Sequence, residues 1–185
     1  HHGDTVSRYD ALVHAKTGAD DNPVLALRAS VALNVEPSPE LTRAASATDA
    51  AGAQYRMAAW FYNNARRSEA QAAADNALEA MSPDHPLYAD ALLLLARCQD
   101  PAVAVATYRR YLAARDDDPV ALHELAAVYR VLGDGATDIT ERTGHYGRAL
   151  NVYERLRASH PELRGVERGR LATLGATEWQ SIYAV

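Results

Sequence analysis

The sequence has little cysteine, one phenylalanine and no long apolar run. A single cysteine, Cys98, cannot form an internal disulfide or build a metal site that needs several cysteines. No stretch approaches the roughly 20 consecutive apolar residues that a membrane-spanning helix requires. The strict alternation of apolar and polar residues that marks a half-buried strand is also missing. These absences predict a chain without a membrane span and favour an all-α fold.

Basic residues are fewer than acidic ones, 19 against 24, which gives a formal net charge of −5. A protein that binds a phosphate backbone needs a basic face, so we expect no nucleic-acid partner. The segment His1-His2-Gly3 resembles the remnant of a purification tag. A leader peptide could have been removed together with the natural start. A single cysteine is compatible with the cytoplasm and with the periplasm, so the sequence leaves the compartment open.

Alanine, in contrast, makes up about a fifth of the 185 residues, and ten tyrosines stand against one phenylalanine. Small side chains next to large rings suit closely packed helices. The clearest example runs from Pro119 to Pro161, which we interpret as a helical hairpin that turns at Gly133-Asp134. Its apolar residues recur at helical spacing: Leu122, Leu125, Ala126 and Tyr129, then Tyr146, Ala149, Leu150, Tyr153 and Leu156. One hairpin cannot cover its own apolar face, so similar neighbours are expected.

The same spacing predicts further helices over residues 4–16, 23–33, 40–51, 51–64, 69–81, 88–98 and 101–113, and one or two closing helices after Pro161. The helix over 23–33 is apolar nearly all round, so we expect it to be largely buried. Ser68 is the expected cap of the helix over 69–81. Gly52 leaves open whether residues 40–64 form one helix or two.

The helix pairs resemble tetratricopeptide repeats. In that family a small residue stands beside a leucine with an aromatic three residues on, and after a turn come alanine, an aromatic and a closing proline. One copy matches at Leu125, Ala126, Tyr129, Gly133, Ala149, Tyr153 and Pro161, and another at Met57, Ala58, Phe61, Glu69, Ala70, Ala77, Leu78 and Pro83. A shorter copy matches at Leu95, Ala96, Arg97, Cys98, Ala104, Tyr108 and Leu112.

The resemblance implies an α-solenoid of antiparallel helix pairs with a C-terminal capping helix. After the tag remnant at 1–3, residues 4–185 would form one domain: a degenerate pair at 4–37, repeats at about 51–83, 85–116 and 119–161, and a cap at 162–185. One departure is a turn after Gly133 that is about eleven residues longer than the family's, which we expect to lengthen the next helix back to a start near Asp138.

No motif in the sequence indicates catalysis. The histidines show no zinc-ligand spacing, and no glycine-flanked nucleophile or phosphate-binding loop occurs. The segment Asp134–Glu141 has oxygens at alternate positions but lacks the ordered acidic series of a calcium loop. We therefore predict no enzyme activity, no cofactor and no metal site.

In the family, the first helix of each pair lines a concave groove that holds a partner segment. The matching helix faces here give the candidates Tyr55, Tyr62, Asn63, Asp90, Arg97, His123 and Arg130. Arg97 and Arg130 would favour an acidic protein or peptide. The alternative is that both tyrosines only pack and both arginines are solvated.

The predicted function is thus a non-catalytic protein-interaction or scaffold module. A second hypothesis makes the chain the regulatory or substrate-presenting part of an enzyme system. A third is self-association into a homo-oligomer through closing helices that carry Trp179, Ile182 and Tyr183.

Overall fold

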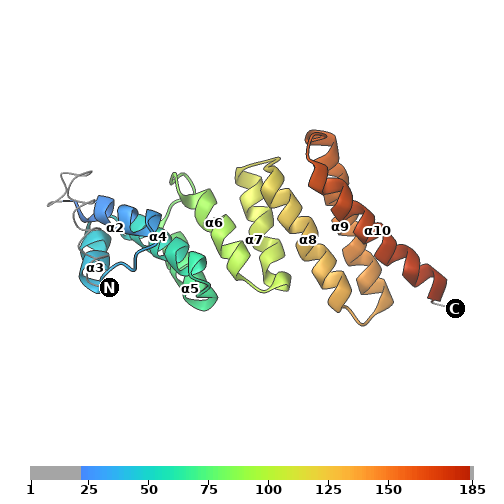
Figure 1. Cartoon of the computed structure of the whole chain (residues 1–185), viewed down its shortest axis with the longest axis horizontal. Helices are drawn as coiled ribbons and strands as arrows, with labels where there is room; N and C mark the ends of the chain where they lie inside the picture. Colours follow the sequence, from blue (N-terminus) through green and yellow to red (C-terminus); the bar gives the residue numbers. More distant parts are fainter. Residues whose placement is uncertain (1–21, 184–185) are drawn as a thin grey trace. The chain divides into compact units, whose positions relative to one another are not determined.

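The structure is a computed structural model that describes residues 22–183, without the side chains of Arg164 and of residues 178–183. The predicted tag remnant, the helix over 4–16 and the side chains proposed for self-association lie outside this description. Every regular element in the described part is a helix, which confirms the all-α prediction (Figure 1). The helices are α2 Pro23–Ala32, α3 Pro39–Thr48, α4 Ala50–Asn63, α5 Arg67–Ala80, α6 Tyr88–Cys98, α7 Pro101–Ala114, α8 Pro119–Gly135, α9 Ile139–Ser159 and α10 Arg164–Tyr183.

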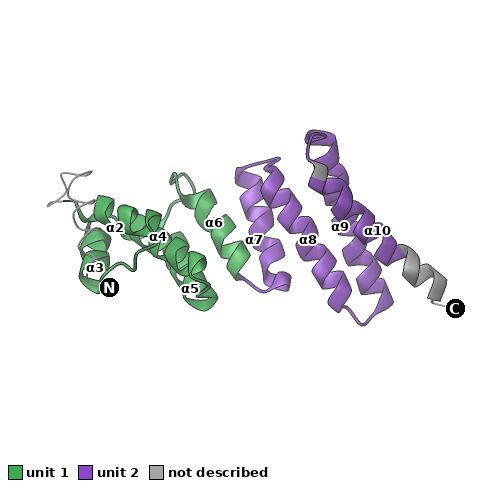
Figure 2. Ribbon diagram, viewed as in Figure 1, with its two compact units in different colours: residues 1–98 green, residues 99–185 purple. Residues whose placement is uncertain are grey.

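The chain divides into two compact units, residues 1–98 and 99–185 (Figure 2). Unit 1 contains α2 to α6, and unit 2 contains α7 to α10. The boundary falls inside the predicted repeat over 85–116, so its two helices belong to different units.

In unit 1, α4 packs against α5, and α6 contacts both of them. Alanines at the centre of this contact, Ala58, Ala70 and Ala74, are fully buried, which lets the helix axes approach closely. Leu94 and Leu95 of α6 complete this part of the core. In the turn before α5, Ala65 has a φ of 58° and the side chain of Arg66 lies over the rings of Trp60 and Phe61.

Unit 2 is built around the pair of α8 and α9, with α7 against α8, and α10 against α9 and α8. Tyr108, Tyr129 and Tyr153 are buried, as the packing pattern predicted. The long turn has the predicted consequence, because α9 begins at Ile139 with Asp138 as its cap, whose Oδ1 accepts from the Glu141 N–H at 2.8 Å. The chain after Pro161 forms one closing helix, α10.

The structure corrects two local expectations and decides a third that the sequence left open. Ser68 is not the cap of α5, because the helix begins at Arg67 and Arg66 holds the cap position without a side-chain hydrogen bond. The helix over 23–33 is not largely buried, because Leu25 is 40% and Leu33 51% exposed even though α2 contacts both α3 and α4. Residues 40–64 form two helices, because Asp49 ends α3 and caps α4 through the Gly52 N–H.

Candidate functional site

In unit 1, α4 and α6 enclose a pocket of about 260 Å³. Its lining consists of Tyr55, Ala59, Tyr62 and Asn63 from α4, and Asp90, Leu93, Leu94 and Arg97 from α6. Five of the seven residues predicted from the sequence are among them. The structure therefore brings this part of the prediction together in one place.

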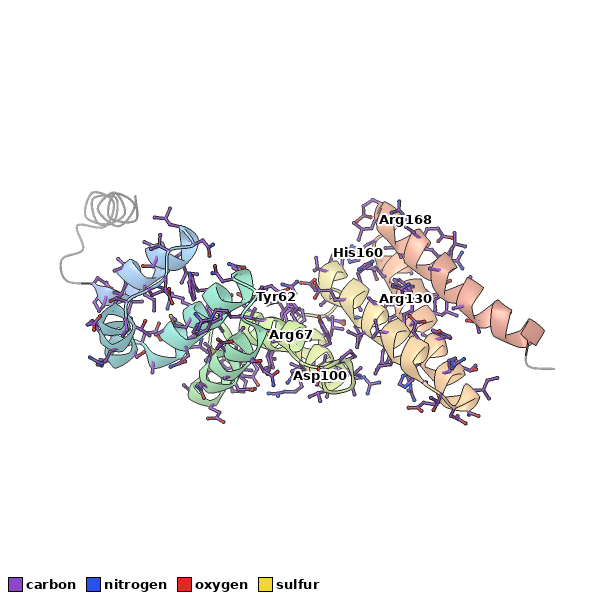
Figure 3. The ribbon with its side chains drawn as sticks, turned by 60° about the horizontal axis from the view of Figure 1, so that its bottom comes forward. Tyr62, Arg67, Asp100, Arg130, His160 and Arg168 are labelled. Atoms are coloured by element: carbon purple, nitrogen blue, oxygen red, sulfur yellow. The ribbon has the colours of Figure 1, made fainter. Side chains whose placement is uncertain are left out.

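Helical geometry explains why these side chains converge. Tyr55 and Tyr62 are seven residues apart on α4, as are Asp90 and Arg97 on α6, and a spacing of seven places two side chains on one face, two turns apart. Leu93 and Leu94 make the floor apolar, with Leu94 itself buried. Tyr62 is 41% exposed, so its ring forms an open wall that a ligand can reach. Figure 3 shows Tyr62 near the end of α4, just before the turn into α5.

A neighbouring pocket of unit 1 shares Tyr55 and Ala59 with the first. It measures about 400 Å³ and is lined by Arg28, Val31, Ala32, Tyr55, Arg56, Ala59 and Leu87. The guanidinium of Arg56 already forms an ion pair with Asp49 at 3.3 Å. The hollowed surface of unit 1 thus continues along α4 on both sides of Tyr55.

The other two predicted residues, His123 and Arg130, lie in unit 2. His123 lines a pocket of about 310 Å³ together with Pro119, Val120, Glu124, Leu156, Leu163, Gly165 and Val166. Its ring lies 6.0 Å from that of Tyr153, edge to face. Arg130 lines none of the pockets described here. It is half-buried on α8, and its Nε has no hydrogen-bond partner in the described part of the chain.

Arg130 nevertheless acts on the buried tyrosine of α9. Burial raises the pKa of the Tyr153 hydroxyl, and the positive charge of Arg130 opposes this shift. The guanidinium of Arg130 is therefore close enough to the packed interior of unit 2 to influence its electrostatics. Arg130 does not join the pocket of α4 and α6 that five of the predicted residues line.

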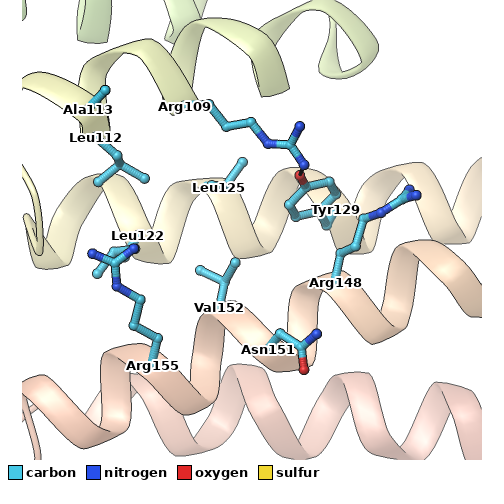
Figure 4. Close-up of a pocket in the computed structure, with 10 residues that line it drawn as sticks. All are labelled: Arg109, Leu112, Ala113, Leu122, Leu125, Tyr129, Arg148, Asn151, Val152 and Arg155. Atoms are coloured by element: carbon cyan, nitrogen blue, oxygen red, sulfur yellow. Dashed lines mark hydrogen bonds between the residues drawn. The ribbon is translucent and has the colours of Figure 1, made fainter.

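Sequence reasoning missed the largest of these pockets, which α7, α8 and α9 form in unit 2 (Figure 4). It measures about 510 Å³ and is lined by Arg109, Leu112, Ala113, Leu122, Leu125, Tyr129, Arg148, Asn151, Val152 and Arg155. The floor is apolar, and three arginines surround it. No carboxylate is among these ten lining residues.

The three arginines differ in what they contact. Nη2 of Arg109 donates to the Tyr129 hydroxyl at 2.7 Å. Arg155 donates to Asp117 through Nε at 2.9 Å and also pairs with Asp116. The hydrogen bonding of Arg155 to Asp117 holds the pKa of the Asp117 carboxyl below its ordinary value. Arg148 is exposed and makes no ion pair with any residue that the structure describes. Arg109 and Arg148 therefore keep charges that no carboxylate neutralises within that part of the chain.

One sequence signal could have revealed this pocket. Four of its lining residues share one face of α9, because they follow one another at spacings of three, one and three: Arg148, Asn151, Val152 and Arg155. The prediction considered only the first helix of each pair, because the family's groove lies there. The residues of this pocket that lie on α9 belong to the second helix of their pair.

Other chemistry is not indicated in the described residues. Within 22–183, no cluster of three histidine, cysteine or acidic side chains is arranged to hold a metal ion. Cys98 is buried, and burial raises the pKa of its thiol, which disfavours the reactive thiolate. None of the helices in this range combines the length and apolar character needed to cross a bilayer.

Comparison with known proteins adds no relative to these observations. The resemblance to tetratricopeptide repeats therefore rests on the residues of this chain. Neither the protein-family models nor the curated protein sequences gave a match to the chain.

Proposed function

We propose that the chain is a non-catalytic protein-interaction module of tetratricopeptide-like helix pairs, which holds a partner segment against α4 and α6. The observation that carries this proposal is the convergence of Tyr55, Tyr62, Asn63, Asp90 and Arg97 on one pocket. These residues were selected from the family's groove positions alone. Side chains chosen at random along the chain would not be expected to line one pocket.

The chemistry of the pocket suits a peptide of mixed polarity. The Asn63 amide can both donate to and accept from a peptide backbone, and a tyrosine presents a rigid ring with a hydroxyl. Arg97 can pair with a carboxylate through two parallel hydrogen bonds, and Asp90 can accept from a cation or an amide. The apolar floor at Leu93 and Leu94 leaves room for one apolar side chain.

The helix packing within each unit supports the repeat assignment. In unit 1 the first helix of one pair, α4, contacts the first helix of the next, α6, and in unit 2 α8 contacts α10 in the same way. Stacking of first helix on first helix is what creates a groove in repeat proteins. The alanines at the matching positions, Ala58 and Ala126, are fully buried.

The test is a selection of binding peptides from a phage-displayed random library against the full chain. Selected peptides are synthesised with a fluorescent label, and their dissociation constants are measured by anisotropy for wild type, Tyr62→Ala and Arg97→Ala. We expect each variant to weaken binding about tenfold or more, as removal of a central aromatic or arginine contact does. Arg43→Ala, an exposed arginine of α3, is the matched control and should bind like wild type.

Circular dichroism and thermal unfolding show whether each variant stays folded. If peptides bind Tyr62→Ala and Arg97→Ala as tightly as wild type, the α4–α6 pocket is not the binding site and the proposal is wrong.

A further inference from the structure

The pocket formed by α7, α8 and α9 is a second surface with its own chemistry. It lies on the side of α8 that carries Leu122, Leu125 and Tyr129. The pocket of about 310 Å³ that His123 and Glu124 line is on another side of the same helix. We propose that the pocket of α7, α8 and α9 binds an acidic peptide segment, with a large apolar side chain inserted into the floor and carboxylates paired with Arg109 and Arg148. The inference does not depend on the site at α4 and α6.

The floor supplies the apolar part of the site. Leu122 and Leu125 are buried in α8, Leu112 is buried in α7, and Val152 of α9 completes the surface. A volume of about 510 Å³ falls within the range of ligand pockets, roughly 300–1,000 Å³. Such a hollow can take a leucine, phenylalanine or methionine side chain and the backbone on either side of it.

Charge complementarity selects an acidic occupant. The chain as a whole has a net charge of −5, yet the lining of this pocket has three arginines and no carboxylate. Two of them, Arg109 and Arg148, have no carboxylate partner in the part of the chain that the structure describes. A positive surface of this kind on an acidic protein attracts acidic partners and repels basic ones.

The combination of two guanidinium groups with an apolar floor favours a peptide over a small anion. Arg109 comes from α7 and Arg148 from α9, and Figure 4 shows them on either side of the Tyr129 ring with the leucine floor beside them. A ligand that uses both guanidinium groups and the apolar floor must carry carboxylates and an apolar side chain together, which a peptide offers and a small anion does not. Apolar anchoring in a groove combined with pairing of carboxylates to arginines is an established mode of peptide recognition. Arg155 is already held by Asp116 and Asp117, so it forms a wall of the pocket.

The test uses the full chain and a phage-displayed random 12-residue library. Enriched peptides are measured by fluorescence anisotropy against wild type, Arg148→Gln, Val152→Glu and the control Arg168→Gln. Arg148 and Arg168 are both exposed arginines of unit 2, so the pair removes the same charge inside and outside the pocket. Figure 3 shows Arg168 on α10.

We expect a class of peptides that combines aspartate or glutamate with leucine, phenylalanine or methionine. Binding of this class should weaken about tenfold in Arg148→Gln and be abolished in Val152→Glu. Its affinity should also fall as salt is added. The affinity should be unchanged in Arg168→Gln and in Arg97→Ala. Since Arg148 makes no ion pair with any residue described in the structure, its replacement should leave the fold intact, which thermal unfolding checks.

The proposal is overturned if no acidic peptide is enriched, or if the enriched peptides bind Arg148→Gln and Val152→Glu like wild type. If every enriched peptide instead loses affinity in Arg97→Ala alone, this pocket is not a binding site while the function proposed for α4 and α6 stands. Binding that requires a second copy of the chain, seen as a concentration-dependent mass in light scattering, also contradicts it.

Discussion

At the scale of single residues, the spacing between helices is set by the smallest side chains. Gly133 of α8 faces the ring of Tyr146 of α9, and a Cβ added there would lie 2.5 Å from Cε1 and 2.7 Å from Cδ1 of that ring. The ring cannot easily move away, because it is buried and its hydroxyl donates to Asp134 at 2.6 Å. Glycine at 133 is therefore required by the close approach of the two helices.

Replacement of Gly133 by alanine should therefore destabilise unit 2. We expect Gly133→Ala to lower the free energy of unfolding by about 1–3 kcal/mol, the usual range for overpacking a filled core. Urea denaturation followed by circular dichroism measures it.

Gly147→Ala is the matched control, because nothing lies within 4 Å of a Cβ at that position of α9. This variant should gain about 0.5–1 kcal/mol from the better helix propensity of alanine. A loss of stability in both variants, or in neither, would contradict the packing described for Gly133.

Residue-level prediction from the sequence succeeded where one helix face decides the position of a side chain. The spacing of seven between Asp90 and Arg97 is enough to place both on the same pocket. It did not identify the pocket around Arg109 and Arg148, because these residues lie on α7 and α9 and meet only once both helices have packed against α8. The binding role of any of these residues stays a prediction.

At the scale of elements, the starts of α2, α3 and α8 each combine an acceptor side chain with a following proline. Asp118 caps α8, accepting from the N–H groups of Val120 at 2.9 Å and Ala121 at 3.0 Å, and Pro119 occupies the first turn. The second carboxylate oxygen accepts from the Tyr111 hydroxyl at 2.7 Å. Asp118 therefore starts α8 and also connects it to α7.

These hydrogen bonds make the stability of α8 depend on pH. Burial by itself raises the pKa of the Asp118 carboxyl, but the hydrogen bonds from Tyr111, Ala121 and Val120 outweigh it and the pKa is lowered. A carboxyl whose pKa is lower in the folded state stabilises the protein above its unfolded pKa of about 4, and this contribution is lost as the pH falls through the folded pKa.

We expect Asp118→Asn to be about 1–2 kcal/mol less stable than wild type at pH 7, because asparagine keeps the cap but loses the charge-assisted bonds. Below pH 4 the difference should shrink, since wild type then loses its advantage. Urea denaturation between pH 7 and pH 3 measures both. Asp84→Asn, at an exposed turn position, should follow wild type throughout, and a constant difference for Asp118→Asn across this range would refute the linkage.

The sequence predicted the elements best where a cap and a proline stand together, as at Asn22-Pro23 and Asp118-Pro119. It misplaced the start of α5, because the chain enters that helix through the left-handed backbone of Ala65 and not through a capping side chain. It overestimated the burial of α2, because burial depends on how many neighbours pack around a helix as well as on its composition.

At the scale of the whole molecule, each of the two units has its own buried core. Leu95 of α6 lies in the core of unit 1 with Ala58 and Ala74, and Leu156 of α9 in unit 2 is fully buried. In arrays of helix pairs, stability is a sum of local packing terms, so damage to one core stays near the damaged element.

We therefore expect core truncations to act within one unit. Leu95→Ala should lower stability by about 2–5 kcal/mol and raise amide exchange in α4, α5 and α6, while α8 and α9 keep wild-type protection. Leu156→Ala should do the reverse. Hydrogen exchange followed by mass spectrometry measures both. Equal loss of protection across all helices in either variant would indicate that the two units unfold together.

The far end of the α8–α9 hairpin has a practical consequence. These helices have 17 and 21 residues, against 14 each in α4 and α5. Two polar contacts join α8 and its C-cap residue to α9 at this end: the Tyr146 hydroxyl donates to Asp134, and Arg142 donates to the Ala136 carbonyl. An insertion between Ala136 and Thr137 would therefore enter a connection that serves this hairpin alone. Engineers who want to attach a fluorophore or fuse a reporter could use this joint and keep both pockets of unit 2 open.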